Sequence, residues 1–453
     1  MAVENTALQI EIEKVLDSGP KDVNHYWSCE IHTPKETLLP ERLISVDFIR
    51  NYDETYGDNN RLEVLMPRGA FFHRIIPHKN NLTVTVKRTP IGENSDSEVT
   101  DNAEQVRRFR AILLRDDNPL LEANLNQVSS ETSVDHTDLD RVEFQLIDLA
   151  LEQLRLKTTG GIVRKAVPAN ALRALLSQLS FNLQLPKNAE VKGVDLVDPD
   201  NTDVRDHVII PQGTKVTTLP MWIQVHCGGV YSKHMGYYLQ NGIWYIYPQF
   251  AFNRFSETNR SLTVVSVPRD RYPDVERTHL KDGDKLIVLS TQGVRFHDDS
   301  EDLQLSLGNG VRYADADYSL ESLVEVTDNK ALMRKADRAA EFLLQNRPDG
   351  QNTAFFSEER ITQNHFEQSS KLSRRAGTHV EVMWDNSNPD YVYPGMPVRY
   401  LYQAEDEVGV LEGTLLRAHT YVSLSGIGVG NTRHLSKTVL VLFVEKPELK
   451  EGN

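Results

Sequence analysis

The run LTVTVK at residues 82–87 alternates apolar and polar side chains with a period of two. This period is typical of a β-strand with one buried face, because successive side chains point to opposite sides of a sheet. The same pattern recurs at residues 26–32, 43–49, 61–66 and 105–114. Strands that follow one another every ~10–15 residues, with turns between them, favour an antiparallel barrel or sandwich.

Polar segments separate these expected strands. Pro67-Arg68-Gly69 and residues 78–81 have the composition of turns. Residues 92–104 and 126–138 are polar and acidic, and we expect long exposed loops there. Residues 143–156 carry an apolar side chain at every second to fourth position, which fits either a strand or a helix.

The middle of the chain is aromatic and contains the clearest hairpin. In YYLQNGIWYIYP (237–248), the pair Asn241-Gly242 separates two apolar runs. Asn-Gly favours a two-residue hairpin turn, because both central residues need positive φ. Apolar stripes at helical spacing predict helices, which are expected at residues 8–16, 168–181, 219–226 and 331–345.

The last part of the chain is again typical of strands. Residues 438–445 are largely apolar, as a core strand would be. Pro394-Gly395-Met396-Pro397 is a predicted turn. Further strands are expected at residues 191–197, 207–211, 262–267, 285–290, 293–297, 379–384, 398–402 and 408–418.

A chain of 453 residues is long enough for about two to four domains. We predict a mainly β fold with minor α, in which two β-barrel-like units flank a mixed α+β central region. The expected parts are a lead-in at 1–24, a first β-barrel-like domain at 25–125, a mixed linker and helical region at 126–185, a central α+β domain with the aromatic hairpin at 186–375, and C-terminal strands at 376–453 that complete a second barrel.

The composition narrows the classes of function. The chain has 50 basic and 65 acidic side chains and a formal net charge of −15. A net negative field repels phosphate backbones, so nucleic acid is a poor default partner. No apolar run approaches the ~20 residues that span a bilayer, and the acidic N-terminus does not resemble a secretory signal.

Cysteine chemistry gives one candidate catalytic fragment. The chain has two cysteines, Cys29 and Cys227, which form no disulfide framework and no zinc-binding spacing. In His226-Cys227-Gly228-Gly229 an imidazole lies next to a thiol in the sequence. Adjacent side chains usually point in different directions, so we interpret Cys227 as a buried thiol at a glycine-terminated helix end. No catalytic, cofactor-binding or metal-binding residue is predicted.

Other groups of residues also favour structural roles. Acidic clusters at residues 135–140, 198–203 and 297–302 lack calcium-binding spacing and are expected to be solvated loops. The aromatic residues of 237–255 are expected in a core or an interface, with the lining of a sugar cleft as the alternative. The arginines on one strand favour a salt-bridged subunit contact over nucleic acid; they are Arg107, Arg108 and Arg110.

Three segments resemble the virion structural proteins of contractile-tailed bacteriophages, most closely the baseplate hub class. One is residues 228–255, where a glycine pair precedes the hairpin ending WYIYP (244–248). A second is residues 384–416, with WDNS (384–387), PGMPV (394–398) and GTLL (413–416). The third is GAFF (69–72) before IIP (75–77), which is similar to the end of the hub's first barrel. These segments contain no catalytic residue to transfer.

The resemblance implies a homotrimer in which each subunit contributes two tail-tube-like β-barrels to a pseudo-six-fold ring. Such a ring joins the six-fold tail tube to the three-fold central spike, so the expected partners are the tube, the spike and other baseplate proteins. DNA would only pass through the lumen, where acidic side chains would let it slide. The resemblance places the protein in the virion tail after assembly in the host cytoplasm, without membrane insertion and without a cofactor.

Two alternatives stay open at this point. The first is another baseplate or tail component, such as a wedge or an adaptor protein. The second is a tail-associated glycan hydrolase, which would need two carboxylates at a suitable separation in a cleft. Such carboxylates can be distant in the sequence, so the 65 acidic residues neither support nor oppose this reading.

Overall fold

The structure is a computed structural model, and it describes most of the chain outside several loops and both ends. It is mainly β with minor α, as predicted. None of the described helices is both long and apolar enough to cross a bilayer. The described residues are 6–17, 24–91, 105–114, 139–186, 189–267, 278–290, 295–297, 310–315, 334–336, 339–346, 352–355, 373–374, 377–404, 407–424 and 434–446.

The first β unit consists of antiparallel strands in the order β3-β4-β7-β6-β5-β1-β2. Their inward side chains, among them Val46, Leu62, Val84 and Phe144, form one hydrophobic core. The strands are β1 (Asn24–His32), β2 (Thr37–Leu38), β3 (Arg42–Asn51), β4 (Asn59–Pro67), β5 (Leu82–Ile91), β6 (Gln105–Leu113) and β7 (Leu139–Asp148).

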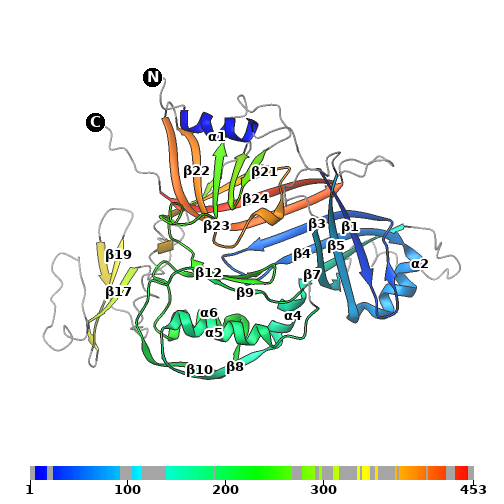
Figure 1. The fold of residues 1–453 in the computed structure, drawn as a ribbon. Coiled ribbons are helices and arrows are strands. Elements are labelled where there is room, and N and C mark those ends of the chain that lie inside the picture. Colours follow the sequence, from blue (N-terminus) through cyan, green and yellow to red (C-terminus); the bar gives the residue numbers. More distant parts are fainter. Residues whose placement is uncertain are drawn as a thin grey trace.

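The second β unit is formed by the strands at the other end of the same sheet (Figure 1). Its core contains Val264, Val288, Trp384, Tyr400 and Leu442. Its strands are β13 (Ser261–Ser266), β14 (His279–Asp282), β15 (Lys285–Ser290), β16 (Arg295–His297), β21 (Gly377–Asp385), β22 (Pro397–Ala404), β23 (Glu407–Leu424) and β24 (His434–Glu445). The short helix α1 (Thr6–Asp17) covers part of this unit, where Val15 packs against Val265 and Leu289.

Strand β23 belongs to both β units. Residues 407–414 pair with β22, and residues 417–423 pair with β3 of the first unit. A β-bulge between Leu415 and Arg417 lies at the point where β23 changes partners. A bulge bends a strand and increases its twist, so this irregularity redirects β23 from one unit into the other. The two predicted β blocks therefore form one continuous sheet.

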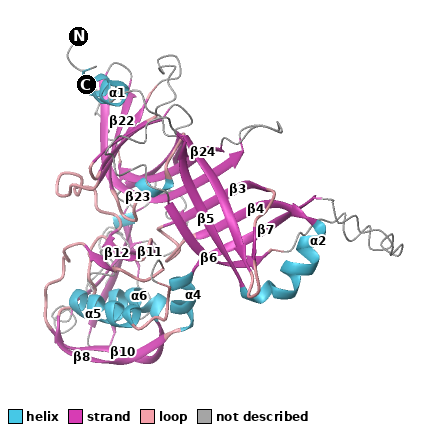
Figure 2. Ribbon diagram, turned by 45° about the vertical axis from the view of Figure 1, so that its right-hand side comes forward, coloured by secondary structure: helices cyan, strands magenta, loops and turns pink. Residues whose placement is uncertain are grey.

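The first β unit is curled, but the expected barrel closure is not found. Trp27 on β1 and Phe48 on β3 have ring centroids 5.6 Å apart, although the two strands are separated by four others in the ladder. Among the strands that the structure describes, no hydrogen-bonded ladder closes either unit into a barrel. Figure 2 shows the strongly inclined strands of this unit.

A central region of three layers lies below the large sheet in the views of Figures 1 and 2. One layer is the sheet β11-β12-β9, the second contains the helices, and the third is the ribbon β8–β10. The elements are α4 (Leu149–Leu156), β8 (Thr158–Ala166), α5 (Pro168–Phe181), β9 (Gly193–Leu196), β10 (Arg205–Lys215), α6 (Leu219–His226), β11 (Met235–Gln240) and β12 (Ile243–Pro248).

Several local predictions are confirmed in this region. The bounds of α5 and α6 are those predicted from the apolar stripes. The hairpin turn has positive φ at Asn241 (54°) and Gly242 (77°), as Asn-Gly requires. The ambiguous segment 143–156 contains both elements, since β7 ends at Asp148 and the Asp148 carboxylate caps α4 by accepting from the amides of Ala150 and Leu151.

Two predictions are wrong. The helix expected at residues 331–345 is replaced by strands β18 (Arg334–Ala336) and β19 (Ala339–Asn346), because β19 pairs with β17 (Gly310–Asp315) and β20 (Asn352–Phe355). Tertiary strand pairing here outweighs helix propensity. In place of the turns expected at residues 67–69 and 78–81, a helical segment, Arg68–Asn81, follows directly after β4 and places Ile75 in the first core.

Other expectations are not tested. The predicted loops at 92–104 and 126–138 lie outside the described residues. The domain boundaries also stay a prediction. The strands β13, β14 and β15, which were expected in the central domain, pair within the large sheet next to β22.

The close approach of β23 and β24 allows no side chain at Gly413. A Cβ atom at this position would lie 1.8 Å from the carbonyl oxygen of Phe443. We expect Gly413→Ala to lower the free energy of unfolding by ~1–3 kcal/mol or more, because backbone must move to relieve the overlap. Urea denaturation measures the change.

Gly193→Ala is the matched control. Gly193 also lies in a strand, but a Cβ atom there would meet no heavy atom within 4 Å. Its substitution should change the free energy of unfolding by less than ~0.5 kcal/mol. Equal effects of the two substitutions would contradict the pairing of β23 with β24.

Candidate functional site

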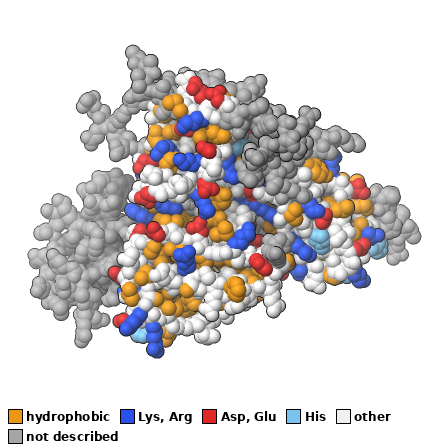
Figure 3. All heavy atoms as spheres, viewed as in Figure 1, with side chains coloured by type: hydrophobic (Ala, Val, Ile, Leu, Met, Phe, Trp, Pro, Cys, Tyr) orange, Lys and Arg blue, Asp and Glu red, His pale blue; other side chains and the backbone are white. Residues whose placement is uncertain are grey.

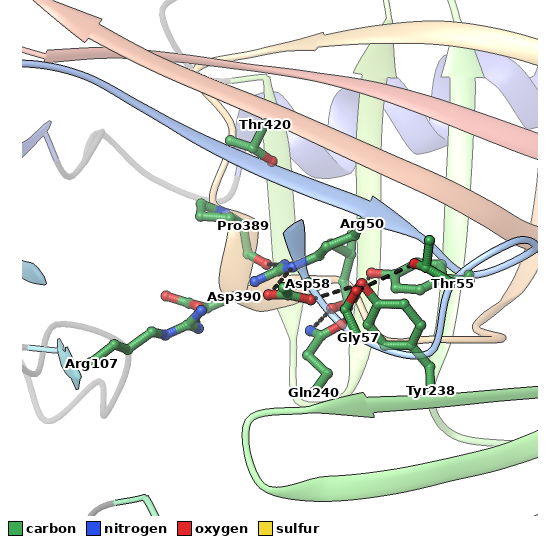
Figure 4. A network of polar contacts seen from close by, with 12 residues as sticks. Arg50, Thr55, Gly57, Asp58, Arg107, Tyr238, Gln240, Pro389, Asp390 and Thr420 are labelled. Carbon is green, nitrogen blue, oxygen red and sulfur yellow. Dashed lines mark hydrogen bonds and ion pairs between the residues drawn. The ribbon is translucent and has the colours of Figure 1, made fainter. Parts of the chain in front are cut away.

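The strongest candidate site is a buried cluster of charged side chains where the two β units and the central region meet (Figure 4). We call it the junction. Its side chains come from segments far apart in the sequence. The junction residues are Arg50 of β3, Asp58, Arg88 of β5, Arg107 of β6, Tyr238 and Gln240 of β11, and Asn388, Pro389 and Asp390 of the loop before β22.

Strand periodicity explains why arginines lie inside. Val46 and Phe48 face the first core, and Arg50 is the next residue on the same face of β3. Val84 and Val86 are followed in the same way by Arg88 on β5. Each inward stripe therefore ends in a cation. The arginine at the end of each apolar alternation is visible in the sequence, although no site was predicted from it.

Arg50 is the most deeply buried charge, with 1% of its surface exposed. Its Nε donates to the Asp58 carboxylate at 3.3 Å, and its Nη1 donates to the carbonyl of Pro389. The Tyr238 hydroxyl donates to the other Asp58 oxygen at 3.0 Å. Burial alone would lower the pKa of Arg50, but Asp58 and the nearby tyrosines outweigh it and the pKa is raised. Arg50 is therefore held as a cation.

The Asp390 carboxylate pairs with two arginines of the first unit, Arg88 and Arg107. Arg88 Nη1 lies 3.0 Å from its carboxylate and also contacts the Asn388 side chain, while Arg107 contacts the second carboxylate oxygen. Burial and the charge of Arg50 lower the pKa of Arg107 to about 9, so Arg107 stays cationic at neutral pH. The loop before β22 is thereby fixed to β5 and β6.

Neutral hydrogen bonds tie the central region to the same place. The Tyr52 hydroxyl donates to Gln240 Oε1 at 3.2 Å, and Gln240 Nε2 donates to the carbonyl of Val392 at 2.8 Å. The rings of Tyr52 and Tyr238 meet edge-to-face with centroids 4.8 Å apart. These contacts link the segment directly after β3, strand β11 and the loop before β22.

The junction consists of charged and polar side chains that connect separate parts of the chain. Arginines and aspartates of opposite charge pair with one another in a poorly solvated place, where such pairs need close geometry. Breaking one member is costly, because its partner stays buried and charged. Asp58, Arg107 and Asp390 also line a cavity of about 350 Å³. The arrangement can fix three parts of the chain relative to one another.

The candidate thiol is not paired with an imidazole. Cys227 is buried, its thiol donates to the carbonyl of Ile209 at 3.6 Å, and burial raises its pKa. His226 is exposed and its ring packs on Trp222 with centroids 4.0 Å apart. Positive φ at Gly228 and Gly229 ends the helical course at this point. The structure thus brings His226 and Cys227 into different environments.

The acidic clusters form no metal site among the described residues. In the cluster 198–203, the Asp200 carboxylate accepts from both the amide and the hydroxyl of Ser232. Asp140 forms a two-oxygen contact with Arg68. Residues 135–138 and 298–302 lie outside the described part of the chain.

The arginine strand is used within the chain. Besides Arg107 in the junction, Arg110 lies 3.3 Å from Glu152, and Arg108 donates to the Thr83 hydroxyl. The expected subunit contact is therefore replaced, for Arg107 and Arg110, by ion pairs within one chain.

Most of the aromatic run is core. Trp244 is fully buried and its Nε1 donates to the Ser180 hydroxyl at 3.2 Å. Tyr245 and Tyr247 line a cavity of about 420 Å³ next to the 394–397 turn. Asp195 also lines it and is paired with Arg260 at 2.8 Å.

Comparison with known proteins gives weak similarities. No family model and no curated protein matches the chain. A tail protein from Neisseria meningitidis is similar with a TM-score of 0.43 and 10% identity, over 92% of this chain and 96% of that one. The 43 kDa tail protein of prophage MuSo2 from Shewanella oneidensis has a TM-score of 0.45 and 8% identity, over 92% and 98%.

A component of the Escherichia coli type VI secretion system, described as similar to bacteriophage T4 tail proteins, has a TM-score of 0.40 and 7% identity. It is matched over 92% of this chain and 77% of its own. These three solved structures are two tail proteins and a secretion-system component. All three TM-scores are below 0.5.

The Arg50–Asp58 pair should be essential for stability. In Asp58→Ala a buried guanidinium loses its carboxylate, and we expect the free energy of unfolding to fall by ~3–5 kcal/mol. Glu143→Ala is the control, because Glu143 pairs with Arg61 at 3.8 Å with both side chains about half exposed. An exposed pair of this kind is worth at most ~1 kcal/mol. Urea denaturation measures both losses of free energy of unfolding. Similar losses in the two variants would show that the buried Arg50–Asp58 pair matters no more than an exposed pair.

His25, next to the junction, should make the fold sensitive to acid. Burial, followed by the charges of Arg88 and His279, lowers the pKa of His25 from 6.5 to about 3. Between these values the unfolded chain binds a proton that the folded chain excludes, so the free energy of unfolding falls as the pH falls from 6.5 towards 3. His25→Gln should lose less stability than the wild type between pH 7 and pH 4, as denaturation at each pH can measure. Parallel profiles would contradict the buried neutral imidazole.

Proposed function

We propose that the chain is a structural component of a phage-type tail, and specifically a baseplate or tail-tip hub. In this proposal three copies form a ring that joins a six-fold tail tube to a three-fold central spike. The partners are the tube, the spike and other baseplate proteins, and the assembled protein belongs to the virion tail. Its work is protein–protein contact without catalysis.

The observation that carries the proposal is the sharing of β23 between the two β units. Three copies of a chain with two rigidly joined β units would present six such units around an axis. A ring of this kind can match a six-fold partner on one side and a three-fold partner on the other. The segments 228–255 and 384–416, whose sequence resembles the hub class, lie in the central hairpin and in the second unit.

The junction supports the same function. A connector between two protein assemblies has to keep its interfaces in fixed relative positions. Arg50, Arg88 and Asp390 fix the first unit to the loop before β22, and Gln240 fixes the central region to that loop. A net charge of −15 also fits a ring through which DNA would pass without adhering.

The experiment is mass measurement on the purified chain, alone and mixed with the tail tube and spike proteins of the same tail. We expect three copies alone and a complex with both proteins. A strict monomer that binds neither protein would contradict the proposal. Six copies at the periphery of assembled tails, in place of three on the axis, would instead identify a wedge protein.

A further inference from the structure

The ribbon β8–β10 has one buried face and one exposed face. Val208 and Ile210 point inward and belong to the core that α5 and α6 share. On the outer face Ile162 and Ile209 lie directly opposite each other across the ladder, and they are 58% and 56% exposed. An exposed isoleucine pair at the centre of a strand ladder is an apolar contact point that this chain does not cover.

Positive charge surrounds this pair. Residues 157–181 and 204–215 contain six lysines and arginines and a single acidic residue, Asp206. These segments carry a formal charge of +5, so the rest of the chain, which is −15 overall, carries −20. In Figure 3 orange and blue side chains predominate at the lower end of the molecule, where Figure 1 places β8 and β10.

The cations of the ribbon have no carboxylate partner among the described residues, unlike several exposed arginines of the β units. Within the described residues, no carboxylate pairs with Arg164, Lys165, Arg205 or Lys215 of the ribbon. On the β units, by contrast, exposed arginines are paired with acids of the same chain, as are Arg61 with Glu143 and Arg141 with Glu63. The ribbon is thus a basic, partly apolar surface on an otherwise acidic protein.

We propose that the outer face of the β8–β10 ribbon docks onto an acidic surface of a second copy of this chain. A second copy is an acidic partner, since outside the ribbon segments it carries −20. The ribbon cannot face its own counterpart, because a two-fold contact would place Arg164 and its neighbours against like charges. The contact therefore joins two different surfaces head to tail, and contacts of this kind form a closed ring when the rotation between copies closes. That the ring has three members rests on the proposed function.

Other anionic partners fit the surface less well. DNA or an anionic membrane would meet the field of the remaining −20 charge, which opposes a polyanion at long range. Neither would use the isoleucine pair as a protein surface can, because a small apolar contact within a charged rim is the usual anatomy of a protein interface.

The test compares self-association of three variants with that of the wild type by light scattering and sedimentation at low and high salt. Arg164→Glu/Lys215→Glu reverses charge at both ends of the ribbon. We expect it to raise the dissociation constant of the oligomer roughly tenfold or more at low salt, with wild-type association itself weakening as salt rises. Ile162→Thr/Ile209→Thr keeps β-branched side chains and should also weaken association. The factor by which it weakens association should be the same at low and high salt.

Lys79→Glu/Lys285→Glu is the matched control. It changes the net charge by the same amount on exposed positions of the two β units. It should leave the dissociation constant within about twofold of the wild type. Equal weakening by this control, or an oligomer that the ribbon variants leave intact, would overturn the proposal.

Three further outcomes distinguish the possible partners of this surface. Binding of double-stranded DNA or phosphatidylserine vesicles that Arg164→Glu/Lys215→Glu abolishes, without any change in oligomer mass, would overturn docking of a second copy. A wild-type monomer at all concentrations would do the same. A trimer that binds tube and spike proteins but ignores the ribbon variants would remove this surface while leaving the proposed function in place.

Discussion

The structure depends on one strand, β23, that belongs to both β units of the large sheet. β23 is bonded to β22 over its first half and to β3 over its second, and β24 pairs with residues 413–424 of it on the other edge. Backbone hydrogen bonds cannot be left unmade in a buried sheet without a cost of a kcal/mol or more each. The two β units are therefore bound to a common backbone, and the bulge near Leu416 sets the angle between them.

The buried charges of the junction give this arrangement its specificity. A buried ion pair contributes little net stability over an apolar contact of the same shape, but it tolerates only one geometry. Arg50 reaches both Asp58 and the Pro389 carbonyl only if β3 and the loop before β22 are in place together. The same holds for Arg88 and Asp390. The buried charges therefore connect separate parts of the chain rigidly.

Local patterns in the sequence predicted much of the secondary structure. The alternation at 82–87, the stripes of α5 and α6 and the Asn241-Gly242 turn each involve neighbours within a few residues, so their signal is complete in a short window. The prediction failed at residues 331–345, where apolar spacing fitted a helix and pairing on both sides of β19 produced a strand. It also failed at residues 68–81, where burial of Ile75 favours a helical segment over two turns.

The sequence by itself determined that this is a mainly β protein of ordinary folded composition, with an acidic surface and helices and a hairpin near its middle. Only the tertiary structure decided that the two β blocks share β23, that Arg107 pairs with Asp390 within the chain, and that Ile162 and Ile209 meet on an exposed ribbon. The physical reason is the separation in sequence. Periodicity reports which face of an element is buried, but it carries no information about which distant element covers that face. Residues such as Arg50 and Pro389, 339 positions apart, become neighbours only through the pairing of strands between them.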